Sequence, residues 1–325
     1  MSNKKILSPV IKFSISFSLI YWIYSRLEIK NNEIFSSIAE IKFSNLALAL
    51  LLIITLLLCK AYRWHLILKN NKVEFSLQNS ISAYFAAFSV GVVTPGRLGE
   101  FLKVYYPHSE GKGSLYTLTK TVLADRLYDL IFLLATGSVS FFILSGKFSI
   151  FHIPLYFFFI VLIIITIPIL IHIFIKPSRN RIIKALQEIN SHFTGRKSVF
   201  FWLITIISYL FYFSACFFLA RSLGIYIDII YLTSVMAILS LGLLLPISIA
   251  GFGTREAILV LLIHPIGYDP STILAFSLIH FLSFFGFLGI VGLVFFLNKP
   301  IKLTNLKKDA RKFHNKIKSK RNQTH

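Results

Sequence analysis

Two polar motifs decide the fold of this chain: Thr94-Pro95-Gly96-Arg97-Leu98-Gly99-Glu100 and Gly251-Phe252-Gly253-Thr254-Arg255-Glu256. Each motif follows an apolar run, turns on proline or glycine, places an arginine and a glutamate, and then opens a new apolar segment. A charged side chain near the centre of a bilayer costs about 2.5 kcal/mol or more, so it is rare there without a role. Because the pattern recurs in both halves of the chain, it indicates a transporter-like site for a charged group.

The composition indicates an all-α polytopic membrane protein. Of its 325 residues 56% are hydrophobic, and the mean hydropathy is +0.74. A soluble domain of this size is not so apolar. The net charge of +21 would suggest nucleic acid in a soluble protein. In a membrane protein, Lys and Arg instead gather in cytoplasmic loops and contact anionic lipid headgroups, so we expect lipid partners and no nucleic acid.

Eight apolar runs divide the chain, and most are long enough to span, since a crossing helix needs about 20 residues. The segments that follow the two motifs, Leu98 to Tyr106 and Ala257 to Ile263, are too short to cross alone and are typical of re-entrant or interfacial helices. The runs fall at about 6–24, 45–59, 79–94, 115–144, 152–175, 198–220, 229–250 and 271–297.

The distribution of positive charge predicts which segments return to their own side. The stretches 60–78 and 97–120 each carry four Lys or Arg, so both should be cytoplasmic. They would lie on opposite sides if the run between them crossed the membrane. The conflict disappears if about 79–108 dips in from the cytoplasm and returns, and if about 229–264 does the same from outside.

The resulting layout has six spanning helices, two re-entrant hairpins and both termini in the cytoplasm. It is an inverted repeat, with one domain at 1–298, pseudo-repeats at about 1–148 and 149–298, and a basic cytoplasmic tail at 299–325. That tail carries ten Lys or Arg and one acid, Asp309. The competing layout has eight full crossings.

Each motif combines a turn with an anion-binding arrangement. Pro95 and Pro246 should stop the incoming helices, and Gly96, Gly99, Gly251 and Gly253 should permit tight turns and close backbone approach. Free N–H groups of the restarted helix suit an anion. The guanidinium groups of Arg97 and Arg255 match a phosphate bidentately; alternatively, each only pairs with a nearby glutamate.

The acidic residues leave more than one role open. Glu100 and Glu256 are expected in the first turn of their helices, as caps, as counter-charges released by substrate, or as proton carriers. Asp125 and Asp129 share one helical face and should point into the protein or, alternatively, lie solvated at the cytoplasmic interface; Arg126 points about 100° away. Arg63, before Trp64, is predicted to be an interface anchor or a donor to a lipid phosphate.

Soluble-type catalytic motifs are missing from the sequence: it has no Walker loop, no paired-cysteine metal site, no G-x-S-x-G and no HExxH. Cys59 and Cys216 both lie in apolar runs and fit neither a disulfide framework nor a metal site. We therefore expect no metal and no cofactor.

Read together, Arg63-Trp64, TPGRLGE at 94–100, DRLYD at 125–129 and LPISIAGFGTRE at 245–256 resemble the flippase-like membrane domain family. This family is also called the lysylphosphatidylglycerol synthase transmembrane region. The resemblance covers essentially the whole chain. It implies that Arg97, Glu100, Asp125, Arg126, Arg255 and Glu256 are the family's polar signature.

The resemblance also implies lipid handling. In two-domain members, a membrane part like this one moves an aminoacylated phospholipid between leaflets, and a separate cytoplasmic domain makes that lipid. After Asn298 this sequence has only a short basic segment, so a single-domain member without the aminoacyl transferase is expected. Some single-domain relatives are linked to glycolipid, hopanoid or polyprenyl-linked sugar pathways.

The expected function is therefore a translocator of an anionic or glycosylated lipid in the cytoplasmic (inner) membrane, a transporter rather than an enzyme. One alternative is a polyprenyl-phosphate glycosyltransferase with Asp125 or Asp129 as base or metal ligand. Another is a non-catalytic membrane partner of a separately encoded synthase or glycosyltransferase.

Overall fold

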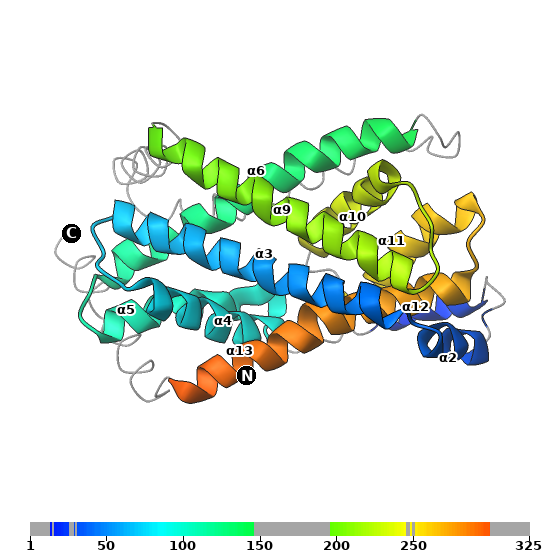
Figure 1. Ribbon diagram of the computed structural model, residues 1–325, viewed down its shortest axis with the longest axis horizontal. Helices are drawn as coiled ribbons and strands as arrows, with labels where there is room; N and C mark the ends of the chain where they lie inside the picture. Colours follow the sequence, from blue (N-terminus) through cyan, green and yellow to red (C-terminus); the bar gives the residue numbers. More distant parts are fainter. Residues whose placement is uncertain are drawn as a thin grey trace, which may run out of the picture.

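The computed structural model describes residues 14, 16–25, 29, 31–145, 196–244, 248 and 251–299. Over these residues every regular element is a helix, which confirms the all-α prediction. The elements are α2 (Asn31–Ala39), α3 (Phe43–Asn70), α4 (Leu77–Val93), the 3₁₀ helix η1 (Pro95–Val104), α5 (Tyr105–Ser109), α6 (Leu115–Ser145), α9 (Arg196–Ser222), α10 (Ile229–Leu244), α11 (Thr254–Ile263), the 3₁₀ turn η2 (His264–Ile266), α12 (Pro270–Phe281), the π-helix η3 (Leu282–Phe287) and α13 (Leu288–Asn298) (Figure 1).

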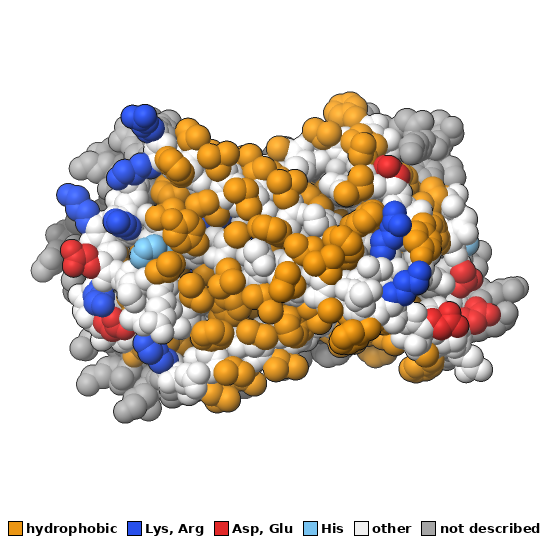
Figure 2. Space-filling view, viewed as in Figure 1, with side chains coloured by type: hydrophobic (Ala, Val, Ile, Leu, Met, Phe, Trp, Pro, Cys, Tyr) orange, Lys and Arg blue, Asp and Glu red, His pale blue; other side chains and the backbone are white. Residues whose placement is uncertain are grey.

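Four stretches of the described chain are long and apolar enough to cross a membrane: Phe43–Asn70, Leu115–Leu144, Arg196–Ser222 and Pro270–Asn298. On the face seen in Figure 2, hydrophobic side chains cover the middle of the molecule, and the charged side chains lie toward its two ends. The chain is thus a polytopic helical membrane protein. The number of crossings stays a prediction, because the run at 152–175 and much of the run at 6–24 lie outside the described residues.

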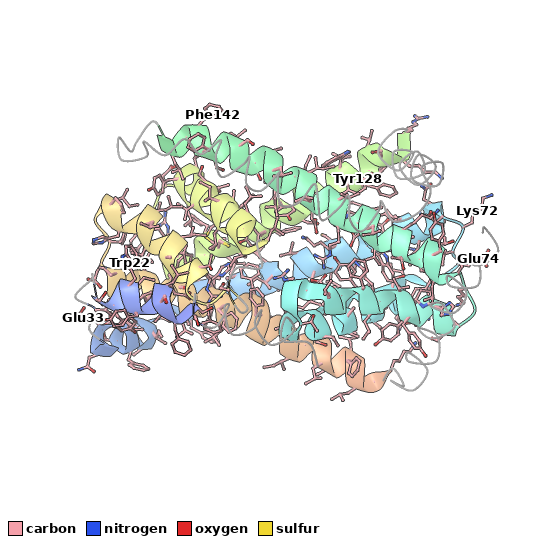
Figure 3. The ribbon with its side chains drawn as sticks, turned by 180° about the vertical axis from the view of Figure 1, so that it is seen from behind. Trp22, Glu33, Lys72, Glu74, Tyr128 and Phe142 are labelled. Atoms are coloured by element: carbon pink, nitrogen blue, oxygen red, sulfur yellow. The ribbon has the colours of Figure 1, made fainter. Side chains whose placement is uncertain are left out.

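The two ends of the molecule differ in charge. Lys72 and Glu74 lie at one end and Glu33 at the other (Figure 3). Hydrogen bonds place further lysines beside the Lys72 end, because Lys197 Nζ donates to Asn70 Oδ1 and Lys299 Nζ donates to Asn79 Oδ1. We call this the basic end, defined by Lys69, Lys72, Lys112, Lys197 and Lys299; the opposite end carries Glu33, Lys42, Arg221, Asp228 and Asp269.

The first motif sits at the tip of a helical hairpin. Ser76 caps α4 by accepting a hydrogen bond from the Asn79 N–H at 3.2 Å, and α4 then runs inward from the basic end. The chain turns at Thr94 and returns through η1 and α5. Lys112, which follows α5, lies 5.6 Å from the ring centre of Phe75, which precedes α4. Both ends of the segment therefore lie at the basic end, as the predicted hairpin at 79–108 requires.

The second motif belongs to a hairpin that starts at the opposite end. Tyr226, which precedes α10, donates its backbone N–H to the Tyr268 hydroxyl at 2.9 Å, and Tyr268 follows α11. Tyr231 near the start of α10 donates its hydroxyl to the carbonyl of Leu262 near the end of α11, at 2.5 Å. The predicted hairpin at 229–264 thus also begins and ends at one end. Its predicted helix stop, Pro246, lies outside the described residues.

The packing of the helices is related by the predicted repeat. When each helix is replaced by its counterpart in the other half of the chain, the same set of packed pairs is obtained. α3 packs along α9, α4 packs along α13, and α10 packs along α6 (Figure 1). Since α3 and α9 precede the two hairpins, and α6 and α12–α13 follow them, this pairing is what an inverted repeat produces. The repeat boundaries near residue 148 remain a prediction, since residues 146–195 lie outside the described part.

Glycines allow the first hairpin to close tightly. A Cβ at Gly99 would lie 2.5 Å from the Val90 carbonyl oxygen, and a Cβ at Gly91 would lie 2.5 Å from Glu100 Cγ. The predicted close approach at Gly99 is therefore real. In the second motif, Gly251 and Gly253 have φ of 81° and 80°, which other residues rarely adopt.

Gly99→Ala should destabilise the protein, because the added methyl group collides with backbone that cannot move aside cheaply; overpacking of this kind costs about 1–3 kcal/mol. The control is Gly289→Ala, whose methyl group would meet only Val92 Cγ2 at 3.9 Å. Apparent melting temperature in detergent measures both. Equal melting temperatures for the two variants would contradict the tight closure of α4 on η1.

Candidate functional site

The most deeply buried charges form an ion-pair network around Arg63. Its guanidinium contacts Asp125 Oδ1 at 2.8 Å and Asp129 Oδ1 at 2.9 Å, and donates to Thr205 Oγ1 at 2.7 Å. Arg63 and Asp125 are fully buried. The four residues come from α3, α6 and α9, so a single side chain of α3 ties together three helices long enough to span.

Two lysines complete the network. Lys103 of η1 lies 2.7 Å from Asp125 Oδ2 and 4.0 Å from the ring centre of Tyr84 on α4. Lys60 of α3 lies 3.0 Å from Asp129 Oδ2 and 4.6 Å from the ring centre of Tyr209 on α9. The sequence reasoning missed both lysines. Neither lysine shows a signal in the sequence, because its contact with an aspartate of α6 forms only when α3 and η1 have packed against that helix.

The structure excludes both predicted roles of Arg63 and one of the two positions left open for the aspartates. Arg63 is not an interface anchor and is not free to bind a lipid phosphate, because its side chain is buried and all three of its nitrogen atoms donate to protein oxygens. Asp125 and Asp129 are not solvated at an interface; both point into the protein, as the shared helical face predicted. Arg63 thus belongs to the framework of the site and not to its contact surface.

The first motif bends through a strained arginine. Thr94 Oγ1 accepts a hydrogen bond from the Gly99 N–H at 2.7 Å, and η1 begins at Pro95. Arg97 then adopts φ of 55°, a left-handed conformation that costs of order 1–3 kcal/mol for a residue with a side chain. Glu100 is the sixth residue of η1, so its predicted place in the first turn of a helix is wrong.

Glu100 is flanked by two guanidinium groups. Its carboxylate contacts Arg126 and lies 3.9 Å from Arg97. Glu100 itself is buried, whereas the side chains of Arg97 and Arg126 are 43% and 31% exposed. Arg97 also stacks on Phe285 of η3, at 4.8 Å from the ring centre. The arrangement presents two cationic, hydrogen-bonding surfaces anchored on one buried carboxylate.

The second motif forms a closed version of the same pattern. Glu256 accepts the Gly253 N–H at 2.7 Å, which makes it a helix cap as predicted, and it accepts Arg255 Nη2 at 2.8 Å. Ser277 of α12 accepts Arg255 Nε at 2.9 Å and donates to Glu256 at 2.7 Å. Arg255 is only 1% exposed. Here the simple pairing of arginine with glutamate, left open by the sequence, is what the structure contains.

The helix formed by α12, η3 and α13 connects the two motifs. Its Ser277 accepts a hydrogen bond from Arg255, and the guanidinium of Arg97 stacks on the ring of its Phe285. His280 lies between these two contact residues on the same helix. The motifs thus converge on one helix from opposite ends of the molecule.

The polar core of the described protein carries an excess of positive charge. The charged side chains counted here are buried in this network or contact it. They are six cations, Lys60, Arg63, Arg97, Lys103, Arg126 and Arg255, against four anions, Glu100, Asp125, Asp129 and Glu256. The two unbalanced positive charges favour an anionic ligand. Among the described residues no group of three or more His, Cys, Asp or Glu could hold a metal ion.

Comparison with known families agrees with this membrane architecture. The family model described as the lysylphosphatidylglycerol synthase TM region matches residues 10–318. The chain therefore belongs to this family. A comparison with curated proteins found no match.

Arg63→Ala should strongly reduce folded protein, because it leaves two buried carboxylates without their main partner; breaking a buried pair costs about 3–5 kcal/mol. The control is Lys112→Ala, which removes an exposed pair with Glu110 at 2.8 Å, worth about 0–1 kcal/mol. The measurement is the monodisperse fraction after detergent extraction, with its melting temperature. If Arg63→Ala were as stable as Lys112→Ala, the network would not hold the helices together.

Proposed function

We propose that this member of the family moves an anionic or glycosylated lipid between the leaflets of the membrane. The observation that carries the proposal is the pair of guanidinium groups on either side of the buried Glu100: Arg97, which is exposed, and Arg126, which is partly exposed. Two such groups match the oxygens of a headgroup phosphate. The excess positive charge of the polar core supports the same choice of ligand.

The position of Arg97 supports a water-filled approach to this site. Arg97 follows the turn of a hairpin that enters the apolar bundle. Exposed guanidinium at such depth is costly against hydrocarbon, so charged residues there face the protein interior or a water-filled cavity. Non-helical backbone is tolerated at membrane depth under the same condition. A headgroup would enter through this cavity while its chains stay in lipid.

Two hairpins that enter from opposite ends support alternating access. In transporters built from inverted repeats, one repeat rocks against the other around a fixed site near the midplane. Arg97 and Arg255 occupy corresponding places in the two hairpins, and both contact the helix formed by α12, η3 and α13. We propose that repeats 1–148 and 149–298 move in this way, and that the headgroup passes from one motif to the other. Glu100 and Glu256 would exchange their arginine partners during the passage.

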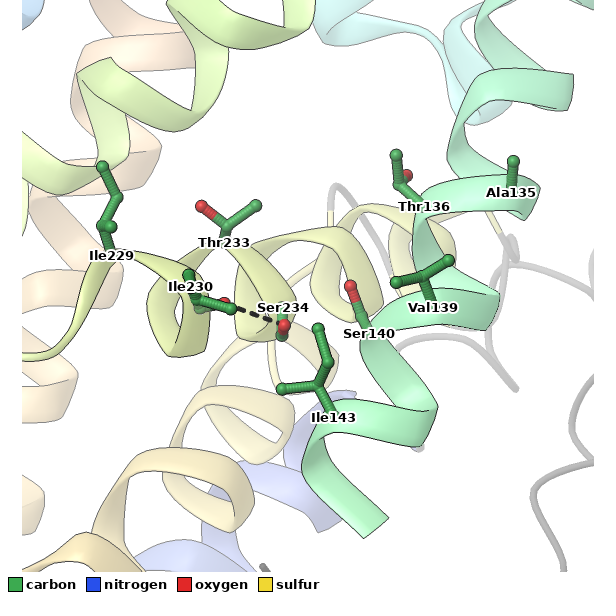
Figure 4. A pocket seen from close by; sticks show the side chains of 9 residues that line it. All are labelled: Ala135, Thr136, Val139, Ser140, Ile143, Ile229, Ile230, Thr233 and Ser234. Atoms are coloured by element: carbon green, nitrogen blue, oxygen red, sulfur yellow. Dashed lines mark hydrogen bonds between the residues drawn. The ribbon is translucent and has the colours of Figure 1, made fainter. Parts of the chain in front are cut away.

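An apolar groove offers a path for the lipid chains. It lies between α6 and α10 and has a volume of about 370 Å³ (Figure 4). Its hydroxyl groups do not make it polar, because Thr136 and Ser234 donate to carbonyl groups of their own helices. On the corresponding pair α4–α13 the packing is close, since a Cβ at Gly292 would collide with the Phe85 carbonyl. The groove is therefore a feature of one side of the bundle.

We further propose that the basic end faces the cytoplasm, with the protein in the cytoplasmic membrane and both termini inside. The lysines that define this end follow the positive-inside rule. The terminal segments 1–13 and 300–325 lie outside the described residues. A separately encoded synthase as partner remains a prediction.

The glycosyltransferase alternative receives less support from the site. A general base or metal ligand needs a carboxylate that substrate can reach. Asp125 is fully buried and is neutralised by Arg63 and Lys103, while Asp129 is held by Arg63 and Lys60. Neither carboxylate has the exposure or the free lone pairs that this chemistry requires.

Purified protein in vesicles should move labelled phosphatidylglycerol between leaflets faster than labelled phosphatidylcholine of the same chain length, because only the former is a net anion. The rate is measured by dithionite quenching of a chain-labelled lipid, with protein-free vesicles as the control. Equal rates for the two lipids would contradict recognition by the Arg97–Arg126 pair, and no acceleration of either would contradict translocation of this lipid class.

Arg97→Gly should abolish most of this translocation without loss of stability. Glycine adopts the left-handed backbone at no steric cost, so the variant should be as stable as the wild type or more so. Lys72→Gly is the matched control, because Lys72 is the other described non-glycine residue with positive φ, at 59°, and lies at the basic end. If Arg97→Gly moved lipid at the rate of Lys72→Gly, Arg97 would have no role in headgroup contact.

A further inference from the structure

Three buried donor or acceptor atoms near the second motif have no hydrogen-bond partner. They are Nη1 of Arg255 and both ring nitrogens of His280. Arg255 is 1% exposed and His280 is 2% exposed, so bulk water does not satisfy them. A buried polar atom left without a partner costs about 1–3 kcal/mol. Three such atoms in one region are therefore expected to be paired in another state of the protein.

Arg255 contacts α12 one helical turn before His280. Arg255 Nε is 2.9 Å from Ser277 Oγ, and His280 is three residues beyond Ser277 on the same helix. Residues three apart on a helix are neighbours on its surface, with Cβ atoms about 5–6 Å apart. The Arg255 guanidinium also lies 4.7 Å from the ring centre of Phe281, one turn after Ser277 on the same helix. An ion of phosphate size that displaced Ser277 from Arg255 could span the guanidinium and the imidazole.

The surroundings of His280 favour an anion. The charged group held on the preceding turn of α12 is the Arg255 guanidinium, which is positive. The remaining contacts of His280 are aromatic: Phe284 at 4.7 Å, Phe276 at 6.4 Å and Tyr212 at 6.5 Å between ring centres. Glu256, the carboxylate of this motif, is engaged by Arg255, Ser277 and the Gly253 N–H. The surroundings of Arg255 and His280 therefore offer hydrogen-bond donors and positive charge, while the carboxylate of Glu256 is already engaged.

We propose that Nη1 of Arg255 and the imidazole of His280 form a second anion-binding site, which takes the phosphate of the lipid headgroup. This site rests on the proposed function and deepens it: it is the place that the headgroup occupies after it leaves Arg97 and Arg126. It is closed in this structure, whereas the Arg97–Arg126 site is open. Opening requires α11 to separate from α12, which would break the contact of Arg255 with Ser277 and free more of the guanidinium group.

The π-helix η3 supports this interpretation. It directly follows His280 and Phe281, and its Phe285 carries Arg97. Single π-helical turns occur often at functional sites, because the wider turn displaces side chains from the regular helical faces. Here α12, which precedes η3, contacts the second motif, and η3 itself contacts the first motif. One helix thereby serves both anion sites.

The test compares His280→Phe with His264→Phe in lipid nanodiscs. His264 is an exposed histidine of the same hairpin, bonded through Nδ1 to the Tyr268 carbonyl at 3.0 Å. The apparent melting temperature is measured in phosphatidylcholine alone and with phosphatidylglycerol added. Wild type and His264→Phe should show the same rise with phosphatidylglycerol. In His280→Phe the rise should fall by at least half, while the melting temperature in phosphatidylcholine should increase, because two unpaired nitrogens have been removed.

A rise of wild-type size in His280→Phe would overturn the second site. If this variant is not recovered in folded form, Arg255→Lys carries the same test, since it keeps a cation for Glu256 and loses Nη1. Binding and translocation are read separately. Loss of the phosphatidylglycerol effect in a protein whose wild type moves no lipid would support the site and reject the translocase. If the wild type moves lipid and His280→Phe keeps the full phosphatidylglycerol effect, the translocase is supported and the second site is rejected.

Discussion

The structure depends on the burial of Arg63 between two aspartates of α6. Removing a guanidinium and two carboxylates from water costs several kcal/mol per ion, and the cost is recovered only where geometry and further hydrogen bonds are good. Here Asp125 receives Arg63, Lys103 and the Tyr84 hydroxyl, and Asp129 receives Arg63 and Lys60. These donors come from α3, α4 and η1. The pairs therefore fix the first hairpin against the long helices, and with it the position of Arg97.

Because of this framework, the first hairpin is anchored more firmly than the second. Lys103 anchors η1 to α6, so Arg97 can remain strained and exposed without unfolding the hairpin. The second hairpin has no such buried lysine in its described part and is held to α12 by Ser277 and the Arg255–Glu256 pair. Fewer and weaker ties make α10–α11 the better candidate for the moving part. The proposed closed site lies where those ties would break.

The sequence predicted the fold class from its apolar composition and the hairpin ends from the distribution of positive charge. It predicted the inward face of Asp125 and Asp129 from the cost of charge in the bilayer. It failed where burial depends on a partner far along the chain. The charges counted as cytoplasmic for 60–78 and 97–120 include Lys60, Arg63, Arg97 and Lys103, and none of these lies in a loop. The remaining lysines of these stretches still make one end of the molecule more basic than the other. Glu100 was misplaced because η1 starts at Pro95 and continues as a 3₁₀ helix, which no local pattern announces.

A membrane protein built only for stability would not keep these features. Replacing buried ion pairs with apolar residues is often neutral or stabilising, and left-handed arginine and unpaired histidine nitrogens each carry a cost. Yet several of these costs are grouped: the left-handed Arg97, the unpaired Nη1 of Arg255 and the unpaired ring nitrogens of His280 fall on the two motifs and on α12. Costs of this kind persist where they are relieved by a ligand or by a second conformation. Since the unpaired groups include the Arg255 guanidinium and an imidazole N–H, and the polar core has excess positive charge, the ligand that relieves them is an anion.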